Sequence, residues 1–379
     1  MICEVILTAF YQENLLSLFT ISDLHPNKKM KSLLVLTVLG FSLGMFSCSQ
    51  AGAPDERVGT ENPQKETRKK TFVPPASETG TSGEIYITVD ESLLPIIEAE
   101  IEQFQGLYPN ASVHPLYMPG EEAIRTMLTG DSIRLAIATR KLTEEEEEIL
   151  ESKTIAPRHS QIFTEGVTLI SHKENNVKDL TRDDLRKILL GDHKSWTDIS
   201  GSNLKNEIRI VFDHAASGTI RFLKDSVLIG QNIRQDNVYA LKSSPSVLEY
   251  VAENTNSIGV IGVSWISDVD DEKMRDFLSK VNVLRIEKPD SGVPCAYEEQ
   301  FFGPWQSFLN QGCYPLRRPV FTILRETSFG LGTGLVSFLD GPVGQRIVHK
   351  AGLSAFHGIP RRVKLPPKEG ARNPLKSKK

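Results

Sequence analysis

The sequence predicts an α/β fold in which a mostly parallel sheet carries helices on both faces. Three units of alternating apolar strand, turn and amphipathic helix follow one another between residues 84 and 150. A further strand, turn and helix occupy residues 208–222, and a continuous apolar strand follows at residues 258–263. This alternation is typical of parallel sheets, because each crossover helix packs against a face of the sheet.

The first three units are defined by apolar spacing and by helix caps. After the strand at residues 84–89, Leu93, Ile97, Ile101 and Phe104 fall on one face of a helix. The other elements expected in this part are strands at 111–117 and 134–139, a helix at 121–128, and a helix opened by the capping box of Thr143 and Glu146.

The later part of the chain continues the alternation. Thr181 is expected to cap a helix that runs to Leu190 and ends at Gly191. The remaining expected elements are strands at 166–170, 208–212, 258–263, 281–286 and 320–324, and helices that start at Ser217, surround 247–253 and cover 335–351.

Composition and motifs argue against several classes of function. The chain has 379 residues, enough for two domains, and a net charge of −4 without a basic domain, so nucleic acid is not an expected partner. No metal motif occurs among the eight histidines, and the glutamate run at 144–148 is expected to be a solvated helix start. Ser217 is not in a nucleophile elbow, since Ala215 and Thr219 occupy the flanking glycine positions. The sequence therefore favours a binding protein without metal or cofactor over a phosphatase-like enzyme.

Residues 1–48 have the pattern of an export signal. Lysines at 28, 29 and 31 precede an apolar run at 33–46, which ends at Ser47 and Cys48 and is too short to span a membrane. Met30 is the expected start, with residues 1–29 an over-extension of the gene model. Cys48 is expected to carry a lipid, as in bacterial lipoproteins; the alternative is a soluble secreted protein that loses Cys48 with the signal.

Two segments outside the expected fold lack the apolar residues needed for a core. Residues 49–82 are rich in Pro, Glu, Lys and Thr and are predicted to form a disordered tether, and residues 361–379 form a basic tail, also predicted to be disordered.

Cys295 and Cys313 remain in the mature chain. An oxidising compartment permits a disulfide between them, and two free buried thiols fit the sequence as well.

The candidate binding site lies at the turns that follow the strands. In open α/β sheets ligands bind beyond the carboxyl ends of the strands, and four turns are expected there, at residues 90–92, 119–121, 139–140 and 213–219. Ser217, Gly218 and Thr219 begin a helix with free backbone N–H groups and adjacent hydroxyls, which is a favourable site for an anion. The alternative is that Ser217 only caps the helix.

The order of these segments resembles the phosphate-binding proteins of bacterial ABC uptake systems, a branch of the type II periplasmic binding proteins. The resemblance covers residues 83–358. It rests on collinear segments, each weak alone: Val89-Asp90-Glu91-Ser92, residues 135–143, residues 179–191 with Trp196, Ser217-Gly218-Thr219, residues 256–262 and residues 338–346.

The resemblance implies a two-lobed fold with mixed sheets and a hinge, in which lobe I comprises residues 83–165 and 325–360 and lobe II residues 166–324. A monomer in the periplasm, anchored to the membrane through its lipid, would close on inorganic phosphate and pass it to the permease subunits of an ABC transporter. The ligand contacts carried over from the family are Glu91, Ser92, Gly120, Glu121, Thr139, Arg140, Ser217, Gly218 and Thr219.

Three positions depart from the family pattern. Glu121 stands in a turn that usually reads Gly-Ser-Gly, Arg140 replaces an acidic residue, and Asp213 replaces an arginine. We interpret the last two as a charge swap, in which Arg140 supplies the cation and Asp213 the acceptor.

A buried Asp213 would accept the proton of hydrogen phosphate and reject fully ionised sulfate, and the alternative is an Asx-type turn residue. Arg221, one turn into the helix, either reaches the site or lies on the surface. The departures also leave open a binding protein or sensor for molybdate, sulfate or an organic anion.

Overall fold

The computed structural model describes residues 78–268, 270–289 and 295–357. The signal region, Cys48, most of the tether and the basic tail lie outside the described residues, so what the sequence predicts for them stays a prediction. All the described residues fall within a single compact unit of the chain.

Lobe I is built on three parallel strands, as predicted. β1 (Gly83–Asp90) pairs on one side with β2 (Ala111–Met118) and on the other with β3 (Ile133–Ala138). The helices of this part are η1 (Glu91–Leu93), α2 (Leu94–Leu107), α3 (Gly120–Thr129) and α4 (Glu144–Glu151). The predicted capping box of Thr143 and Glu146 is present at the start of α4.

Lobe II repeats the parallel arrangement. β6 (Arg209–Phe212) pairs with β7 (Val238–Ala240) and with β8 (Ser257–Gly262). The helices that accompany these strands are α5 (Arg182–Leu190), α6 (Gly218–Ser226), α7 (Ser244–Glu253) and α8 (Glu272–Lys280). Thr181 caps α5, and Gly191 ends it with a positive φ of 90° that suits glycine.

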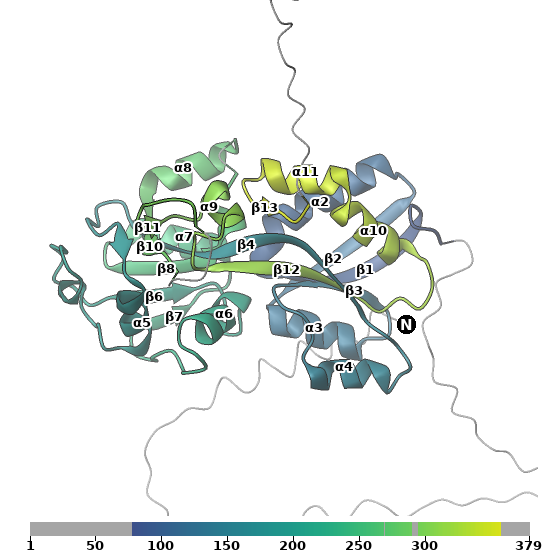
Figure 1. The fold of residues 1–379 in the computed structure, drawn as a ribbon, viewed down its shortest axis with the longest axis horizontal. Coiled ribbons are helices and arrows are strands. Elements are labelled where there is room, and N and C mark those ends of the chain that lie inside the picture. Colours follow the sequence, from purple (N-terminus) through teal and green to yellow (C-terminus); the bar gives the residue numbers. More distant parts are fainter. Residues whose placement is uncertain (1–77, 269, 290–294, 358–379) are drawn as a thin grey trace, which may run out of the picture. The chain divides into compact units, whose positions relative to one another are not determined.

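Two antiparallel strands connect the lobes. β4 (Arg158–His172) pairs with β12 (Arg317–Leu324) along residues 158–166 and with β8 along residues 167–171. β12 also pairs with β3, which gives the strand order β2-β1-β3-β12-β4-β8-β6-β7 (Figure 1). β4 changes its partner from β12 to β8 between Gly166 and Val167, and the lobe boundaries proposed from the sequence stay a prediction. β4 begins at Arg158, earlier than the predicted strand at 166–170. The prediction missed its first half, because an apolar pattern does not identify the polar residues there.

The predicted last helix at 335–351 is wrong in one respect, since the structure has two helices there. α10 (Leu331–Asp340) ends at Gly341, and α11 (Pro342–Lys350) starts at the next residue. Pro342 has no N–H with which to continue α10 and suits the first position of a new helix.

The predicted strand at 281–286 is likewise two strands. β9 (Val281–Val283) pairs with β4, while β10 (Arg285–Glu287) pairs with two short strands of a separate sheet. The remaining elements are β5 (Asp179–Leu180), η2 (Trp196–Asp198), η3 (Val263–Trp265), β11 (Phe301–Phe302), α9 (Gln306–Asn310) and β13 (Ser354–Ala355).

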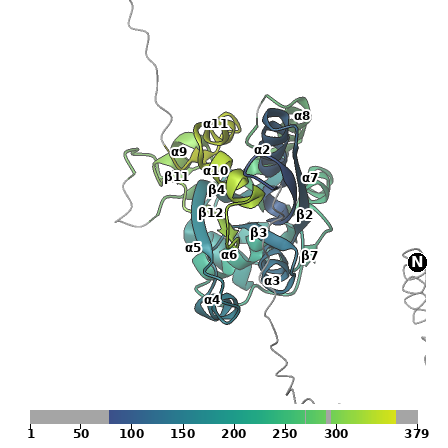
Figure 2. The ribbon, with the colours of Figure 1, turned by 90° about the vertical axis from the view of Figure 1, so that its right-hand side faces the viewer.

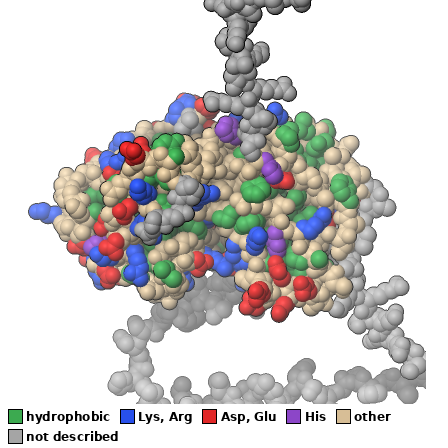
Figure 3. Space-filling model, in the orientation of Figure 1, with side chains coloured by type: hydrophobic (Ala, Val, Ile, Leu, Met, Phe, Trp, Pro, Cys, Tyr) green, Lys and Arg blue, Asp and Glu red, His purple; other side chains and the backbone are tan. Residues whose placement is uncertain are grey.

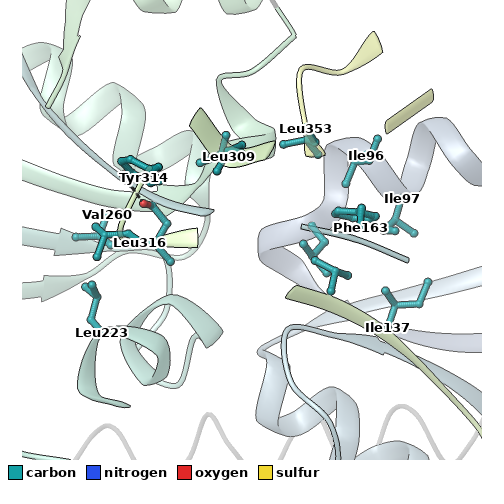
Figure 4. Packing of buried hydrophobic residues seen from close by; sticks show 14 of the residues in the cluster. Ile96, Ile97, Ile137, Phe163, Leu223, Val260, Leu309, Tyr314, Leu316 and Leu353 are labelled. Carbon is teal, nitrogen blue, oxygen red and sulfur yellow. Dashed lines mark hydrogen bonds between the residues drawn. The ribbon is translucent and has the colours of Figure 1, made fainter. Parts of the chain in front are cut away.

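Helices cover both faces of the lobe I strands. Two views show α2, α10 and α11 on one face and α3 and α4 on the other (Figures 1 and 2). One apolar cluster includes residues of both lobes, among them Ile97, Ile137 and Phe163 on one side and Val260 and Leu316 on the other (Figure 4). This arrangement confirms the predicted α/β class.

Two further features bear on the sequence predictions. Cys295 and Cys313 form a disulfide, which decides between the alternatives left open above. Among the described helices, none combines the length and the apolar character needed to cross a membrane.

Candidate functional site

The four predicted turns meet around the carboxyl group of Asp90, a fully buried residue at the end of β1. Asp90 Oδ1 accepts hydrogen bonds from Ser92 N at 3.1 Å and from Ser92 Oγ at 2.7 Å. Asp90 Oδ2 accepts one from Thr139 Oγ1, beyond the end of β3, at 3.3 Å. Gly120 and Gly218, the first residues of α3 and α6, both lie against Oδ2. Asp90 belongs to the predicted turn at residues 90–92 but was not among the predicted ligand contacts, and it marks the point where loops of the two lobes converge.

The two glycines at this point have a steric reason to be glycines. A Cβ added at Gly120 or at Gly218 would collide with Asp90 Oδ2. Their small size lets the positive ends of two helix dipoles, one from each lobe, approach the same spot. The first residues of α3 and α6 thus both lie next to the carboxyl group of Asp90.

Asp213, in the turn after β6, is fully buried. Its Oδ1 accepts hydrogen bonds from His214 N at 3.0 Å and from Thr219 Oγ1 at 3.4 Å, and its Oδ2 accepts one from Ser244 Oγ at 3.3 Å. Burial raises the pKa of this carboxyl, and the neighbouring Asp90 raises it further. Asp213 is thus buried, as its proposed role as acceptor requires. It also makes the hydrogen bonds within its own turn that the alternative, an Asx-type turn residue, implies.

The start of α6 has the expected cap. Ser217 Oγ accepts a hydrogen bond from Ile220 N at 3.3 Å and lies 2.7 Å from Thr219 Oγ1. Both hydroxyls are buried. Ser217 therefore caps the helix and also stands at the convergence of the lobes, so the two interpretations of this residue do not exclude each other.

Glu91 has an incompletely satisfied carboxyl group. Its Oε1 is buried and has no hydrogen-bond partner. Burial raises the pKa of Glu91 to about 7, with additional contributions from Asp213 and Asp90. The protonation state of this side chain therefore changes near neutral pH.

Arg318 and Glu165 form a buried ion pair that sequence reasoning missed. They face each other on β12 and β4, and neither side chain is exposed. Arg318 Nε donates to Glu165 Oε1 at 2.9 Å, and Nη2 donates to the same oxygen and to Ser92 Oγ, the latter at 2.8 Å. The sequence does contain a signal for the burial of Arg318, because strand alternation puts it on the same face as the buried Val320 and Thr322.

A second charged cluster lies beside Gly120 and Gly218. Arg140 Nη2 donates to Glu121 Oε2 at 2.7 Å, and its Nη1 donates to Glu146 Oε2 at 2.6 Å. Arg221 Nη1 bonds to Glu121 Oε1 from the other lobe, and its Nε lies 3.4 Å from Asp225 Oδ2. Burial alone would raise the pKa of Glu121, but hydrogen bonds from Arg140 and Arg221 lower it on balance. A pocket of about 220 Å³ adjoins this cluster.

The cluster explains the start of α4 more fully than the sequence did. Acidic side chains gather on the surface over this helix (Figure 3), and Glu144, Glu145 and Glu148 are exposed, as predicted. Glu146 instead binds Arg140. No group of three His, Cys, Asp or Glu side chains in the described part of the chain is arranged to hold a metal ion.

Carboxyl groups outnumber cations at the base of the site. Asp90, Glu91, Glu165 and Asp213 lie there with Arg318. Burial raises the pKa of Glu91, of Glu165 and of Asp213. Each of these three carboxyl groups therefore takes up a proton more readily than an exposed carboxyl group does.

Comparison with known proteins gives the family. The family model described as PBP superfamily domain matches residues 74–340. The phosphate-binding protein PstS of Staphylococcus haemolyticus is 26% identical over 238 residues, which are 62% of this chain and 69% of that protein. PstS of Bacillus subtilis is 23% identical over 245 residues, 64% of this chain and 73% of that protein.

Solved structures show the same fold. A putative phosphate ABC transporter substrate-binding protein from Clostridium perfringens, solved with bound phosphate, matches with a TM-score of 0.58 and 23% identity, covering 73% of this chain and 100% of that one. A phosphate transport receptor from Vibrio cholerae matches with a TM-score of 0.53 and 19% identity, covering 72% of this chain and 100% of that one. With a family model that matches most of its length and a two-lobed α/β structure, this chain belongs to the PBP superfamily.

Proposed function

We propose that this protein captures inorganic phosphate in the cleft between its lobes and delivers it to the permease subunits of an ABC transporter. The observation that carries the proposal is the convergence of two helix N-termini, one from each lobe, on a buried point at Asp90. Helix N-termini bind phosphate through their free N–H groups and their dipoles. The relatives named as phosphate-binding proteins support the same ligand.

The proposed binding residues are those of the four turns. Backbone N–H groups would come from α3 and α6, and hydroxyl groups from Ser92, Thr139, Ser217 and Thr219. The full proposed set is Glu91, Ser92, Gly120, Glu121, Thr139, Arg140, Asp213, Ser217, Gly218, Thr219 and Arg221, to which we add Asp90.

The excess of carboxyl groups favours a protonated oxyanion. Hydrogen phosphate can donate its proton to Asp90 or Asp213, whereas sulfate would face an unpaired buried carboxylate. In the charge swap proposed above, Arg140 would supply the cation. Its guanidinium is held by Glu121 and Glu146, so it would have to release one of them to reach the ligand.

We further propose an extracytoplasmic protein that acts as a monomer and is held at the bacterial membrane by a lipid on Cys48. The apolar run before Cys48 supports export. The disulfide between Cys295 and Cys313 supports an oxidising compartment. Metabolic labelling with a fatty acid would test the anchor, with Cys48→Ser as the variant that should lose the label.

A thermal-shift panel with phosphate, arsenate, sulfate and molybdate tests the ligand. A ligand at one hundred times its Kd stabilises the folded protein by about 2.7 kcal/mol. We expect stabilisation by phosphate and arsenate and little by sulfate. No shift with any inorganic oxyanion would contradict the proposal.

One observation favours a second candidate, the binding of a larger organic anion. The pocket of about 220 Å³ between Arg140 and Arg221 leaves room for more than a phosphate group. Phosphate esters such as glycerol phosphate belong in the same panel. Stronger stabilisation by an ester than by inorganic phosphate would favour this candidate.

A further inference from the structure

Arg318 occupies a special place in the fold. It lies on β12, one of the two strands that connect the lobes, directly opposite Glu165 on β4. One residue further along β4, the pairing with β12 ends and the pairing with β8 begins. A cation at this point is buried between the sheet portions of both lobes.

The guanidinium of Arg318 is only partly satisfied. Nε and Nη2 bond to Glu165 Oε1, and Nη2 also bonds to Ser92 Oγ. Nη1 is buried and has no hydrogen-bond partner. Leaving a charged donor buried without a partner is costly, and such a group in a folded protein calls for an explanation.

The surroundings of Arg318 belong to the proposed site. Ser92, which accepts its hydrogen bond, donates in turn to Asp90. Ser264 Oγ donates to Ser92 O at 3.0 Å, and Ser264 N donates to Glu165 Oε2 at 3.4 Å. Arg318 is thus linked by hydrogen bonds to the first ligand turn.

Arg318 also acts electrostatically on lobe II. Burial raises the pKa of Asp213, and Arg318 lies near enough to oppose that rise. The arginine therefore stands between the first turn of lobe I and the acceptor candidate of lobe II. Arg140 and Arg221 are also paired with carboxylates, but they are partly exposed, whereas Arg318 is fully buried.

We propose that Arg318 binds the captured oxyanion directly through Nη1, with Glu165 as the positioning residue that fixes its guanidinium. The inference rests on the proposed function and adds to it a ligand residue on the strands between the lobes. An oxygen of the anion accepts a hydrogen bond from Nη1 when the lobes close. The buried positive charge offsets part of the charge of the ligand.

Calorimetry with inorganic phosphate tests the proposal on the full chain. Arg318→Lys keeps the charge but replaces the three guanidinium nitrogens with one ammonium nitrogen, so Glu165 and the ligand can no longer both be bound in the same way; we expect at least tenfold weaker binding, as for the loss of one charge-assisted hydrogen bond. Arg317→Lys is the matched control, because the adjacent side chain on β12 points to the other face of the strand. It should bind phosphate within about twofold of the wild type.

A crystal structure of the wild-type protein with phosphate gives a second measurement that does not depend on the folding of a variant. The expected result is a phosphate oxygen within about 3.2 Å of Nη1. A phosphate bound without contact to Arg318, or an unchanged affinity of Arg318→Lys, would overturn this inference and leave the proposed function intact. If the wild type did not bind phosphate at all, the proposed function would fail, and the inference with it.

Discussion

Glu121 of α3 binds Arg221 of α6, so an ion pair joins the two lobes beside the proposed site. The same carboxylate binds Arg140 within lobe I. Glu121 occupies a turn where the family pattern has no acidic residue, and the pairing gives that departure a physical role. The side chain holds two arginines from different lobes together.

The first prediction concerns this ion pair. Arg221→Gln removes this ion pair between the lobes and leaves Glu121 bound to Arg140. Both partners are partly exposed, so we expect a loss of only about 0.2–1 kcal/mol from the closed state. Small-angle scattering should show a larger mean radius of the unliganded protein. Asp225→Asn, which removes only the pairing within α6, is the control, and an equal effect of both variants would contradict the interpretation.

The second prediction concerns the buried ion pair. Glu165→Gln leaves Arg318 without its counter-ion, and we expect the free energy of unfolding to fall by about 3 kcal/mol. Phosphate should stabilise this variant less than the wild type, because Glu165 no longer holds the guanidinium of Arg318 in position for the ligand. Chemical denaturation with and without phosphate measures both effects.

The control for that experiment is Asp179→Asn, since Asp179 forms an exposed pair with Arg285. Its loss should cost less than about 1 kcal/mol. Equal stabilisation of Glu165→Gln and the wild type by phosphate would argue against a ligand near Arg318.

The third prediction concerns the pH dependence of binding. The pKa of Glu91 is raised to about 7, so the side chain becomes an anion as the pH rises through that value and then repels an anionic ligand. Glu91→Gln should match the wild type at pH 6 and bind phosphate more tightly than the wild type at pH 8. Because phosphate itself titrates, the ratio of the two affinities is the quantity to measure. A ratio that is constant across this range would show that Glu91 does not face the ligand.

The fourth prediction concerns Glu100 in α2. Both of its carboxylate oxygens are buried without partners, and burial raises its pKa from 4.5 to about 8. The folded state therefore holds this proton more tightly than the unfolded state, so stability falls as the pH rises from 4.5 toward 8, by up to about 1.4 kcal/mol per pH unit.

Glu100→Gln should remove this slope and be more stable than the wild type at pH 8. Unfolding at a series of pH values measures it. The exposed Glu102→Gln, on the same helix, serves as the control and should keep the slope of the wild type.

The fifth prediction concerns the close approach at the start of α6. Gly218→Ala places a methyl group against Asp90 Oδ2, and we expect a loss of about 1–3 kcal/mol from crowding. Gly106→Ala is the matched control, because a Cβ there meets nothing within 4 Å and should stabilise α2 by about 0.5–1 kcal/mol. If denaturation showed Gly218→Ala to be as harmless as Gly106→Ala, the lobes would not approach each other as described.

Local signals explain why most elements could be predicted. The capping boxes of α4 and α5, the stop at Gly191 and the cap at Ser217 depend on neighbouring residues, and all of them are present in the structure. The failures have local causes too. The apolar spacing continues across Gly341 and Pro342, so the pattern predicted one helix where the structure has two. The first half of β4 was missed because it carries polar residues, among them the buried Glu165.

By itself the sequence determined the α/β class, the order of the strands and helices, and the turns that carry the candidate site. These properties follow from apolar period, caps and turns, which act over a few residues. Only the tertiary structure decided that Asp90 lies where the four turns meet, that Glu121 bridges Arg140 and Arg221, and that Arg318 and Glu165 face each other between the lobes. Each of these contacts joins side chains far apart in the chain, and the pairing of β4 with β12 and the approach of two helix ends bring them within hydrogen-bond distance.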